Sequence, residues 1–312
     1  SARAISRVVC RQRQIQGSLA GCRCDPGNLS SRAYTSGHIG LDHPIARAPG
    51  ILQSSAGMAV SDNGRRFVLL MPWGRVGSNL VAATLARSPD IRIDNEPTTR
   101  IRTFGERDGV PKEDQAQQQL AELETFLAED PDDMRAAGLK LSYRSLIEPR
   151  VYLARLRAAA VPLVLMTRKN HLKCAVSQLR ARVRAGAEST PWQSPWAVRA
   201  QEPKPGPVEI DPAETVRLAK LFERLHAETL KAVRRVYGDD WLSIEYAELA
   251  ASPNSEIGRI CDWTGLDRPE TEDLPHRKAT SDDLSEDVLN YTELASAAEA
   301  AGFADMLSRT PG

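Results

Sequence analysis

The chain has 312 residues, and its 41 basic and 41 acidic side chains give a formal net charge of zero at pH 7. A balanced charge provides no overall attraction to nucleic acid or to an anionic membrane, so any anion-binding site must be local. The longest apolar runs, at 67–71 and 161–166, are far shorter than the roughly 20 residues that a membrane-spanning helix needs. This length suits a single α/β domain with a large core and a tail.

Residues 1–57 differ in composition from the rest of the chain. They include seven Arg, no Lys and two acidic residues, with many Ser and Gly and no sustained apolar period. Such a composition is typical of an organelle transit segment or of a disordered arm, and an over-extended reading frame upstream of Met58 would look the same. We favour the last two interpretations and expect the folded domain to span 58–312.

The number and spacing of the cysteines indicate in which cellular compartment the protein is expected. There are five, scattered along the chain, and Cys22 and Cys24 lack the further ligands that a zinc site needs. We therefore expect reduced thiols in a cytoplasmic protein, with import directed by the N-terminal tail as the alternative.

From Arg65 onward, short apolar runs alternate with amphipathic stretches. The apolar runs predict strands at 66–71, 91–94, 138–143, 161–166 and 241–245. Apolar side chains at helical spacing, with Pro and Gly near the ends, predict helices at 80–85, 112–129, from 149 onward, and at 172–183, 211–236 and 253–265. Strands that alternate with helices predict a P-loop-NTPase-like α/β fold, in which helices flank a doubly wound parallel sheet of about five strands.

The segment 186–207 interrupts this alternation. It contains five prolines together with Trp192 and Trp196. A long loop inside a compact domain is usually functional or disordered, and we interpret this one as a lid over the active site. Its two Trp side chains either stack on a ligand ring with a flat apolar face, such as that of an acceptor sugar, or anchor the lid by packing.

The turn between the first predicted strand and the first predicted helix has the sequence Pro72-Trp-Gly-Arg-Val-Gly-Ser-Asn-Leu80. A tight turn into a helix N-terminus presents backbone N–H groups and the positive end of the helix dipole, which suits a phosphate or sulfate. Gly77 allows close approach of the backbone. Ser78 and Asn79 add hydrogen-bond donors, and Arg75 adds a cation. An ordinary glycine turn without a ligand is the alternative.

Two features of magnesium-dependent nucleotide sites are missing. The turn lacks the Gly-Lys-Ser/Thr ending of a Walker A motif, and with it the lysine and the magnesium-binding hydroxyl. The fourth predicted strand ends in Thr167-Arg168 rather than in an Asp that could hold magnesium. Both differences predict a phosphate site that works without a metal ion.

A second basic motif, at 167–177, runs from the end of the fourth predicted strand into the next helix. Arg168 and Lys169 stand at the carboxyl end of the strand, where ligands bind in open α/β sheets. Ser177 lies two turns into the helix. Basic residues are unfavourable at a helix N-terminus, so these two residues and Lys173 indicate an anion that offsets their charge. A solvated basic helix start is the alternative.

Together the two motifs resemble those of the sulfotransferases that use 3′-phosphoadenosine-5′-phosphosulfate (PAPS). The resemblance is strongest to the bacterial carbohydrate branch, such as the nodulation-factor and trehalose sulfotransferases. In this superfamily an Arg-x-Gly-Ser turn holds the 5′-phosphosulfate, and a later basic pair with a Ser in the next helix holds the 3′-phosphate. The resemblance implies these donor-binding residues: Arg75, Val76, Gly77, Ser78, Asn79, Arg168, Lys169, Ser177, Arg277 and Lys278.

Three further segments resemble segments of the family and occur in the same order as there. The resemblance as a whole spans about 65–307. The segments 244–249 and 252–253 look like the family's Tyr-Glu-Asp-Leu strand ending, and 278–291 resembles a C-terminal segment whose loop often covers the cofactor. One departure concerns Lys169, because the family usually has a second Arg there; a lysine is expected to loosen bidentate phosphate binding.

The resemblance also implies the catalytic residues. Glu96 follows the second predicted strand, in a region where a Glu of the carbohydrate branch contacts the acceptor, and it is the candidate base beside a catalytic Arg75. A solvated loop acid is the alternative for Glu96. His171 is the next candidate base; it either touches the cofactor or is exposed at the helix start. His226 is expected to be structural.

The implied enzyme transfers the sulfuryl group of PAPS to a hydroxyl of a small-molecule or glycan acceptor, with a carbohydrate favoured, and releases 3′,5′-ADP by in-line displacement. No metal ion, nucleic acid or membrane is expected to take part. The alternatives are a metal-dependent nucleotide kinase or NTPase on a related fold and a non-catalytic nucleotide-binding scaffold. The missing Walker lysine and strand-end Asp speak against the first, and Arg75 with Glu96 speaks against the second.

Overall fold

The computed structural model describes residues 65–129, 135–187, 198–269 and 274–308. All of them belong to the unit Met58–Gly312. Two of the sequence-based predictions lie outside the described residues: the tail at 1–57, and the part of the lid at 186–207 that contains Trp192 and Trp196.

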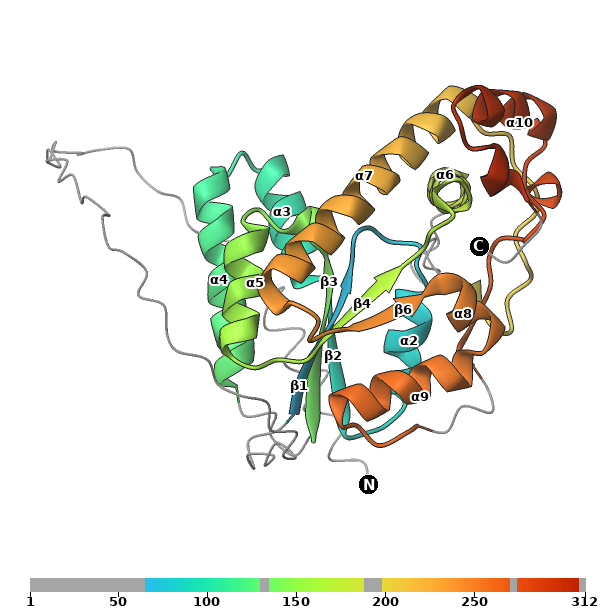
Figure 1. Ribbon diagram of the computed structural model, residues 1–312. Helices are drawn as coiled ribbons and strands as arrows, with labels where there is room; N and C mark the ends of the chain where they lie inside the picture. Colours follow the sequence, from blue (N-terminus) through green and yellow to red (C-terminus); the bar gives the residue numbers. More distant parts are fainter. Residues whose placement is uncertain (1–64, 130–134, 188–197, 270–273, 309–312) are drawn as a thin grey trace, which may run out of the picture. The chain divides into compact units, whose positions relative to one another are not determined.

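The centre of this unit is a parallel sheet with the strand order β2-β3-β1-β4-β6 (Figure 1). Its strands are β1 (Arg65–Met71), β2 (Ile91–Asn95), β3 (Ala136–Ser142), β4 (Leu163–Thr167) and β6 (Leu242–Glu245). The predicted fold class, a five-stranded parallel sheet flanked by helices, is therefore confirmed. β4 begins two residues later than predicted, because the Val161 N–H bonds to the Leu156 carbonyl at the end of the preceding helix and Pro162 has no N–H.

The helices of the described residues are α2 (Ser78–Leu85), α3 (Pro97–Arg107), α4 (Lys112–Ala128), α5 (Pro149–Ala158), α6 (His171–Ala187), α7 (Pro212–Tyr237), α8 (Tyr246–Ala251), α9 (Pro253–Thr264) and α10 (Tyr291–Ala300). Short 3₁₀ turns lie at Tyr143–Ser145, Leu284–Glu286 and Ala304–Leu307, and the two-residue strands β5 (Val198–Arg199) and β7 (His276–Arg277) pair antiparallel. None of the described helices is both long and apolar enough to cross a membrane.

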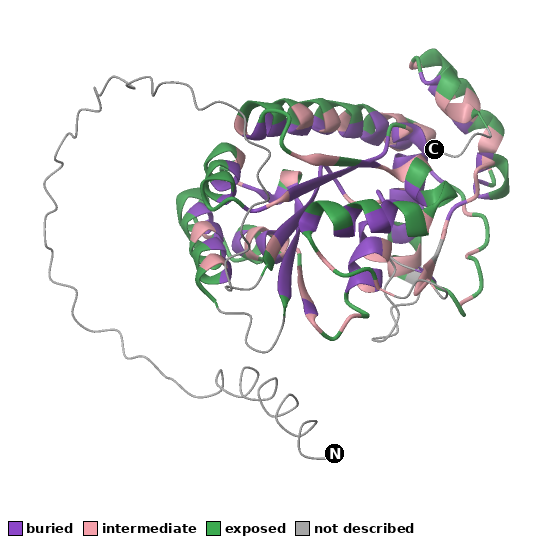
Figure 2. Ribbon diagram, turned by 60° about the horizontal axis from the view of Figure 1, so that its bottom comes forward, coloured by how far each residue is buried: buried purple, intermediate pink, exposed green. Residues whose placement is uncertain are grey.

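The sheet is buried on both faces, as its apolar strands predict. Val68 and Leu70 of β1 point to the face that α4, α5 and α7 cover. Phe67 and Leu69 point to the opposite face, which α2 and α9 cover. Figure 2 shows the result: β1, β3 and β4 are buried throughout most of their length, the edge strands β2 and β6 are buried only in part, and the helices expose one side. Polar side chains that contact a ligand must therefore stand at the ends of the strands.

The ends of several helices follow the chemistry of their terminal residues. The Asp211 carboxylate accepts a hydrogen bond of 2.9 Å from the Ala213 N–H and caps α7, which begins with Pro212. Gly265 ends α9 in the left-handed region, with φ of 71°. The helices α3, α8 and α10 were not predicted, because they are short or lack an apolar stripe; α3 buries only Pro97, Thr98 and Gly105.

Candidate functional site

A cavity of about 1170 Å³ lies at the carboxyl ends of the strands. Its lining comes from the segments that follow β1, β2, β3, β4 and β6, from α6 and from the residues after β7. This is where ligands bind in open α/β sheets. The predicted site residues that line it are Arg75, Gly77, Ser78, Asn79, Glu96, Arg168, Ser177 and Lys278.

The turn after β1 approaches the cavity with a strained backbone. Arg75 and Gly77 both lie in the left-handed region, with φ of 71° and 83°. A Cβ at Gly77 would come within 2.7 Å of a Leu249 methyl group, so any other residue would both strain the backbone and displace that side chain of α8. Helix α2 then starts at Ser78 without a side-chain cap. Its first turn is thus open to an anion in the cavity.

The two basic motifs meet across the sheet. The Arg75 Nε donates a hydrogen bond of 2.9 Å to the Ser177 Oγ on α6, and an Arg168 Nη donates one of 3.3 Å to the Arg75 carbonyl. The Arg168 guanidinium also lies 4.2 Å from the centre of the Tyr246 ring. Burial, with a further contribution from the charge of Arg168, lowers the pKa of Arg75 to about 10. Two guanidinium groups held this close favour a ligand that carries several negative charges.

Glu96 stands on the other side of the β1–α2 turn. It is the residue before α3 and has a φ of 49°, which is unusual for a residue other than glycine. Its Oε1 lies 3.1 Å from the Lys140 Nζ, and its Oε2 accepts a hydrogen bond of 3.1 Å from the Thr99 hydroxyl. The Lys140 ammonium also donates to the Asn79 Oδ1. The carboxylate is therefore held in place and is connected, through Lys140 and Asn79, to the turn after β1 and the start of α2.

Lys140 is a site residue that the sequence analysis did not identify. Its side chain is only 5% exposed, and it lines the cavity from β3. A lysine is rarely buried unless it is paired, and this one stands alone among the small and apolar residues of the Ala136–Leu141 stretch. That isolated charge within a buried strand was the available signal.

Backbone strain coincides with this site. Among the residues that the structure describes, Arg75, Glu96 and Ala160 are the only ones besides glycine with positive φ. The first two line the cavity, whereas Ala160 lies in the turn that ends α5. Strained residues persist where the surrounding structure over-determines them, and they cluster at active sites.

Several predicted residues lie elsewhere. Val76 is buried, Lys169 is exposed, and neither lines the cavity. Lys173 is fully buried in the first turn of α6. The His171 Nε2 lies 3.1 Å from the His226 Nδ1, outside the cavity lining, and burial lowers the pKa of His171 to about 4. This position and low basicity argue against His171 as the base.

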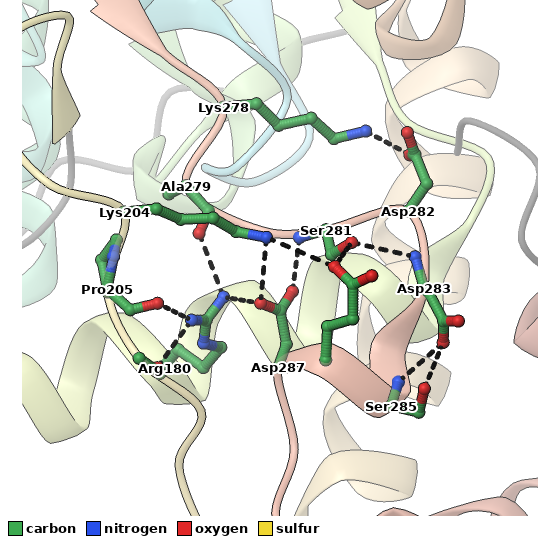
Figure 3. Close-up of polar contacts among 12 residues, drawn as sticks. Arg180, Lys204, Pro205, Lys278, Ala279, Ser281, Asp282, Asp283, Ser285 and Asp287 are labelled. Atoms are coloured by element: carbon green, nitrogen blue, oxygen red, sulfur yellow. Dashed lines mark hydrogen bonds and ion pairs between the residues drawn. The ribbon is translucent and has the colours of Figure 1, made fainter.

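The residues after β7 are fixed by a buried ion pair (Figure 3). A guanidinium nitrogen of Arg180 lies 2.7 Å from the Asp287 Oδ1, and the two side chains are 4% and 1% exposed. Arg180 also donates hydrogen bonds of 2.8–3.0 Å to the carbonyls of Ala279, Pro205 and Gly206. The pair therefore ties α6 to two separate loops.

One of these loops reaches the cavity. Lys278, Ala279 and Thr280 line it, and the Lys278 ammonium is paired with the Asp282 carboxylate (Figure 3). The Asp287 Oδ2 accepts a hydrogen bond of 2.5 Å from the Ser281 N–H just beyond. The predicted residue Arg277 belongs to β7, but its side chain lies outside the described part of the chain. No group of three or more His, Cys, Asp or Glu side chains in the described ranges could hold a metal ion.

Comparisons with known proteins give the following results. No family model matches the chain, and a search of curated proteins found no match either. The chain is similar to the solved structure of a sulfotransferase from Alicyclobacillus acidocaldarius, with 17% identity, a TM-score of 0.42 and coverage of 79% of this chain and 94% of that one. It is also similar to the sulfotransferase domain of the Synechococcus PCC 7002 olefin synthase, with 16% identity, a TM-score of 0.39 and coverage of 76% and 88%.

Proposed function

We propose that the protein is a sulfotransferase that moves the sulfuryl group of PAPS to a hydroxyl of a small molecule or glycan and releases 3′,5′-ADP. The observation that carries this proposal is the shared cavity. One cavity brings together the cationic turn after β1, the Arg168–Ser177 motif and a fixed carboxylate, Glu96. Its volume of about 1170 Å³ exceeds the roughly 300–1,000 Å³ of common ligand pockets, as a nucleotide with an acceptor beside it requires.

The donor would lie along the cationic side of this cavity. Arg75, Ser78 and the N-terminus of α2 would bind the 5′-phosphosulfate, and Arg168, with Ser177, would bind the 3′-phosphate; their common position in the cavity lining supports these roles. In the reaction, the acceptor oxygen attacks sulfur while the bond from sulfur to the bridging phosphate oxygen breaks. Arg75 and the backbone donors of the turn stabilise the negative charge that grows on that bridging oxygen. The proton of the acceptor hydroxyl passes to the Glu96 carboxylate.

We expect 3′,5′-ADP to stabilise the protein against thermal unfolding without magnesium, because guanidinium groups and backbone donors take the place of the ion. At 100 times its dissociation constant, the ligand should add about 2.7 kcal/mol to the free energy of unfolding. The measurement is a thermal-shift titration with 3′,5′-ADP in a chelator, compared with ATP plus magnesium. Stabilisation that appeared only with ATP and magnesium would indicate a kinase or NTPase instead.

Arg75 and Arg168 should differ in their kinetic effects. Arg168→Ala is expected to raise the KM for PAPS with little change in kcat, because the 3′-phosphate undergoes no chemistry and its binding is uniform. Arg75→Ala should lower kcat by about 10²–10³-fold, as the loss of an oxyanion donor does. Lys169→Ala is the matched control, since this neighbouring cation is exposed outside the cavity. Initial-rate kinetics with labelled PAPS give both constants; identical effects of the two Arg variants would contradict this division of roles.

A further inference from the structure

The acceptor side of the cavity is formed by α3 and the turn after β3. Thr99 connects these two elements, because its hydroxyl contacts both the Glu96 Oε2 at 3.1 Å and the Ser145 Oγ at 2.7 Å. An Arg102 Nη donates to the carbonyl of Arg144, the residue before Ser145. The backbone of Arg144 is thus fixed, and its neighbour Ser145 is linked through Thr99 to the carboxylate that we propose as the base.

The Arg144 side chain covers one face of Trp73 and adds hydrogen-bond donors to this side of the cavity. Its guanidinium lies over the Trp73 ring, 3.7 Å from the ring centre, and both residues line the cavity. A sugar ring therefore cannot stack on the face of Trp73 that the guanidinium covers. A guanidinium stacked on an aromatic plane keeps its N–H donors at the edges, where they suit a carboxylate or a phosphate.

The charges near Arg144 are predominantly positive. Arg102 is paired with Glu106 at 2.8 Å, but within the described ranges no carboxylate forms an ion pair with Arg144. Burial and then the charges of Arg102 and Arg182 lower the pKa of Arg144, while Glu106 has a smaller, opposing effect. An anion bound here would relieve this repulsion, whereas a neutral acceptor would leave it in place.

We infer, on the basis of the proposed sulfuryl transfer, that the acceptor is an anionic hydroxyl compound whose acidic group binds Arg144 while its hydroxyl faces Glu96. The acidic group is a carboxylate, a phosphate ester or a sulfate ester. Arg102 and Glu106 form the rim of this subsite. Arg144 then determines the acceptor class, and the residues around Arg75 bind the donor.

The test uses acceptors in matched pairs, each a neutral sugar and its acidic counterpart: methyl glucoside with methyl glucuronide, glucose with glucose 6-phosphate, and glucose with glucose 6-sulfate. Transfer from labelled PAPS and thermal stabilisation of the 3′,5′-ADP complex are both measured. We expect the acidic member of at least one pair to be preferred by about tenfold or more, the scale of one charge-assisted hydrogen bond. The pair with the greatest preference identifies the acidic group.

Arg144→Gln should abolish this preference. The rate of transfer to the acidic acceptor should fall by about 10- to 100-fold, whereas the rate with the neutral acceptor and the KM for PAPS should not change. Arg268→Gln removes the same charge from an exposed residue that neither lines the cavity nor acts on Arg144, and should keep the preference. Equal use of neutral and acidic acceptors in both readouts, an equal effect of Arg144→Gln on both, or a raised KM for PAPS would each overturn the inference. Failure of 3′,5′-ADP to bind would instead overturn the proposed function.

Discussion

Glu96→Gln is expected to lower turnover by about 10²–10⁴-fold while 3′,5′-ADP binds with nearly the affinity of the wild type. A sugar hydroxyl is a weak nucleophile at neutral pH, and glutamine keeps the size of the side chain but cannot accept the proton. The Lys140 Nζ and the Thr99 hydroxyl hold the carboxylate at one place in the cavity, so the amide should occupy the same position. Loss of turnover would then report the loss of proton acceptance.

The measurement is kcat with labelled PAPS, together with 3′,5′-ADP binding by calorimetry. Glu122→Gln is the matched control, because this glutamate is exposed on α4 and does not line the cavity. If Glu96→Gln kept a tenth or more of wild-type turnover, Glu96 would not be the base. The role would then fall to Glu106 or His276, which also line the cavity, rather than to His171, which does not.

Arg180→Met is expected to lower the free energy of unfolding by about 3–5 kcal/mol, because it removes the nearest counter-charge of the buried Asp287 carboxylate. Asp287 is fully buried; Arg180 lies 2.7 Å from it, and the more exposed Lys204 lies at 3.8 Å. Arg180 also donates hydrogen bonds to the carbonyls of Ala279, Pro205 and Gly206. Urea unfolding measures the change. The KM for PAPS should rise as well, since the loop that carries Lys278 into the cavity loses its anchor.

The double variant Arg180→Met with Asp287→Leu provides the control for this prediction. Replacing both members of a buried pair by apolar residues is often neutral or stabilising, so much of the lost stability should return. Arg155→Met removes one member of an exposed pair, with Glu124, and should change stability little. A single variant as stable as the wild type, or a double variant as unstable as the single one, would show that the pair does not fix this loop.

The sequence by itself predicted the layers of this protein and the edge of the sheet at which the candidate site lies. Short apolar segments flanked by amphipathic stretches predicted all five strands of the parallel sheet, most clearly β1, β3 and β4, because burial on both faces favours apolar residues there. Asp211, Pro212 and Gly265 predicted helix ends, because capping and left-handed geometry depend on the residue itself. The Arg-x-Gly-Ser turn and Arg168 could be assigned to one ligand site because the carboxyl ends of parallel strands meet at one edge of the sheet.

Contacts between distant residues were decided only by the tertiary structure. Adjacent Arg168 and Lys169 look equivalent in the sequence, yet only Arg168 enters the cavity. Glu96 pairs with Lys140, and Arg180 pairs with Asp287. The members of each pair are far apart in the sequence, so no local sequence pattern predicts that they meet. The first pairing follows from the position of β2 beside β3, which sets Asn95 opposite Lys140, and the second from loops that return to α6. Side-chain direction at the end of a strand, and the partner of a buried charge, depend on which elements pack together, and that is a property of the folded chain.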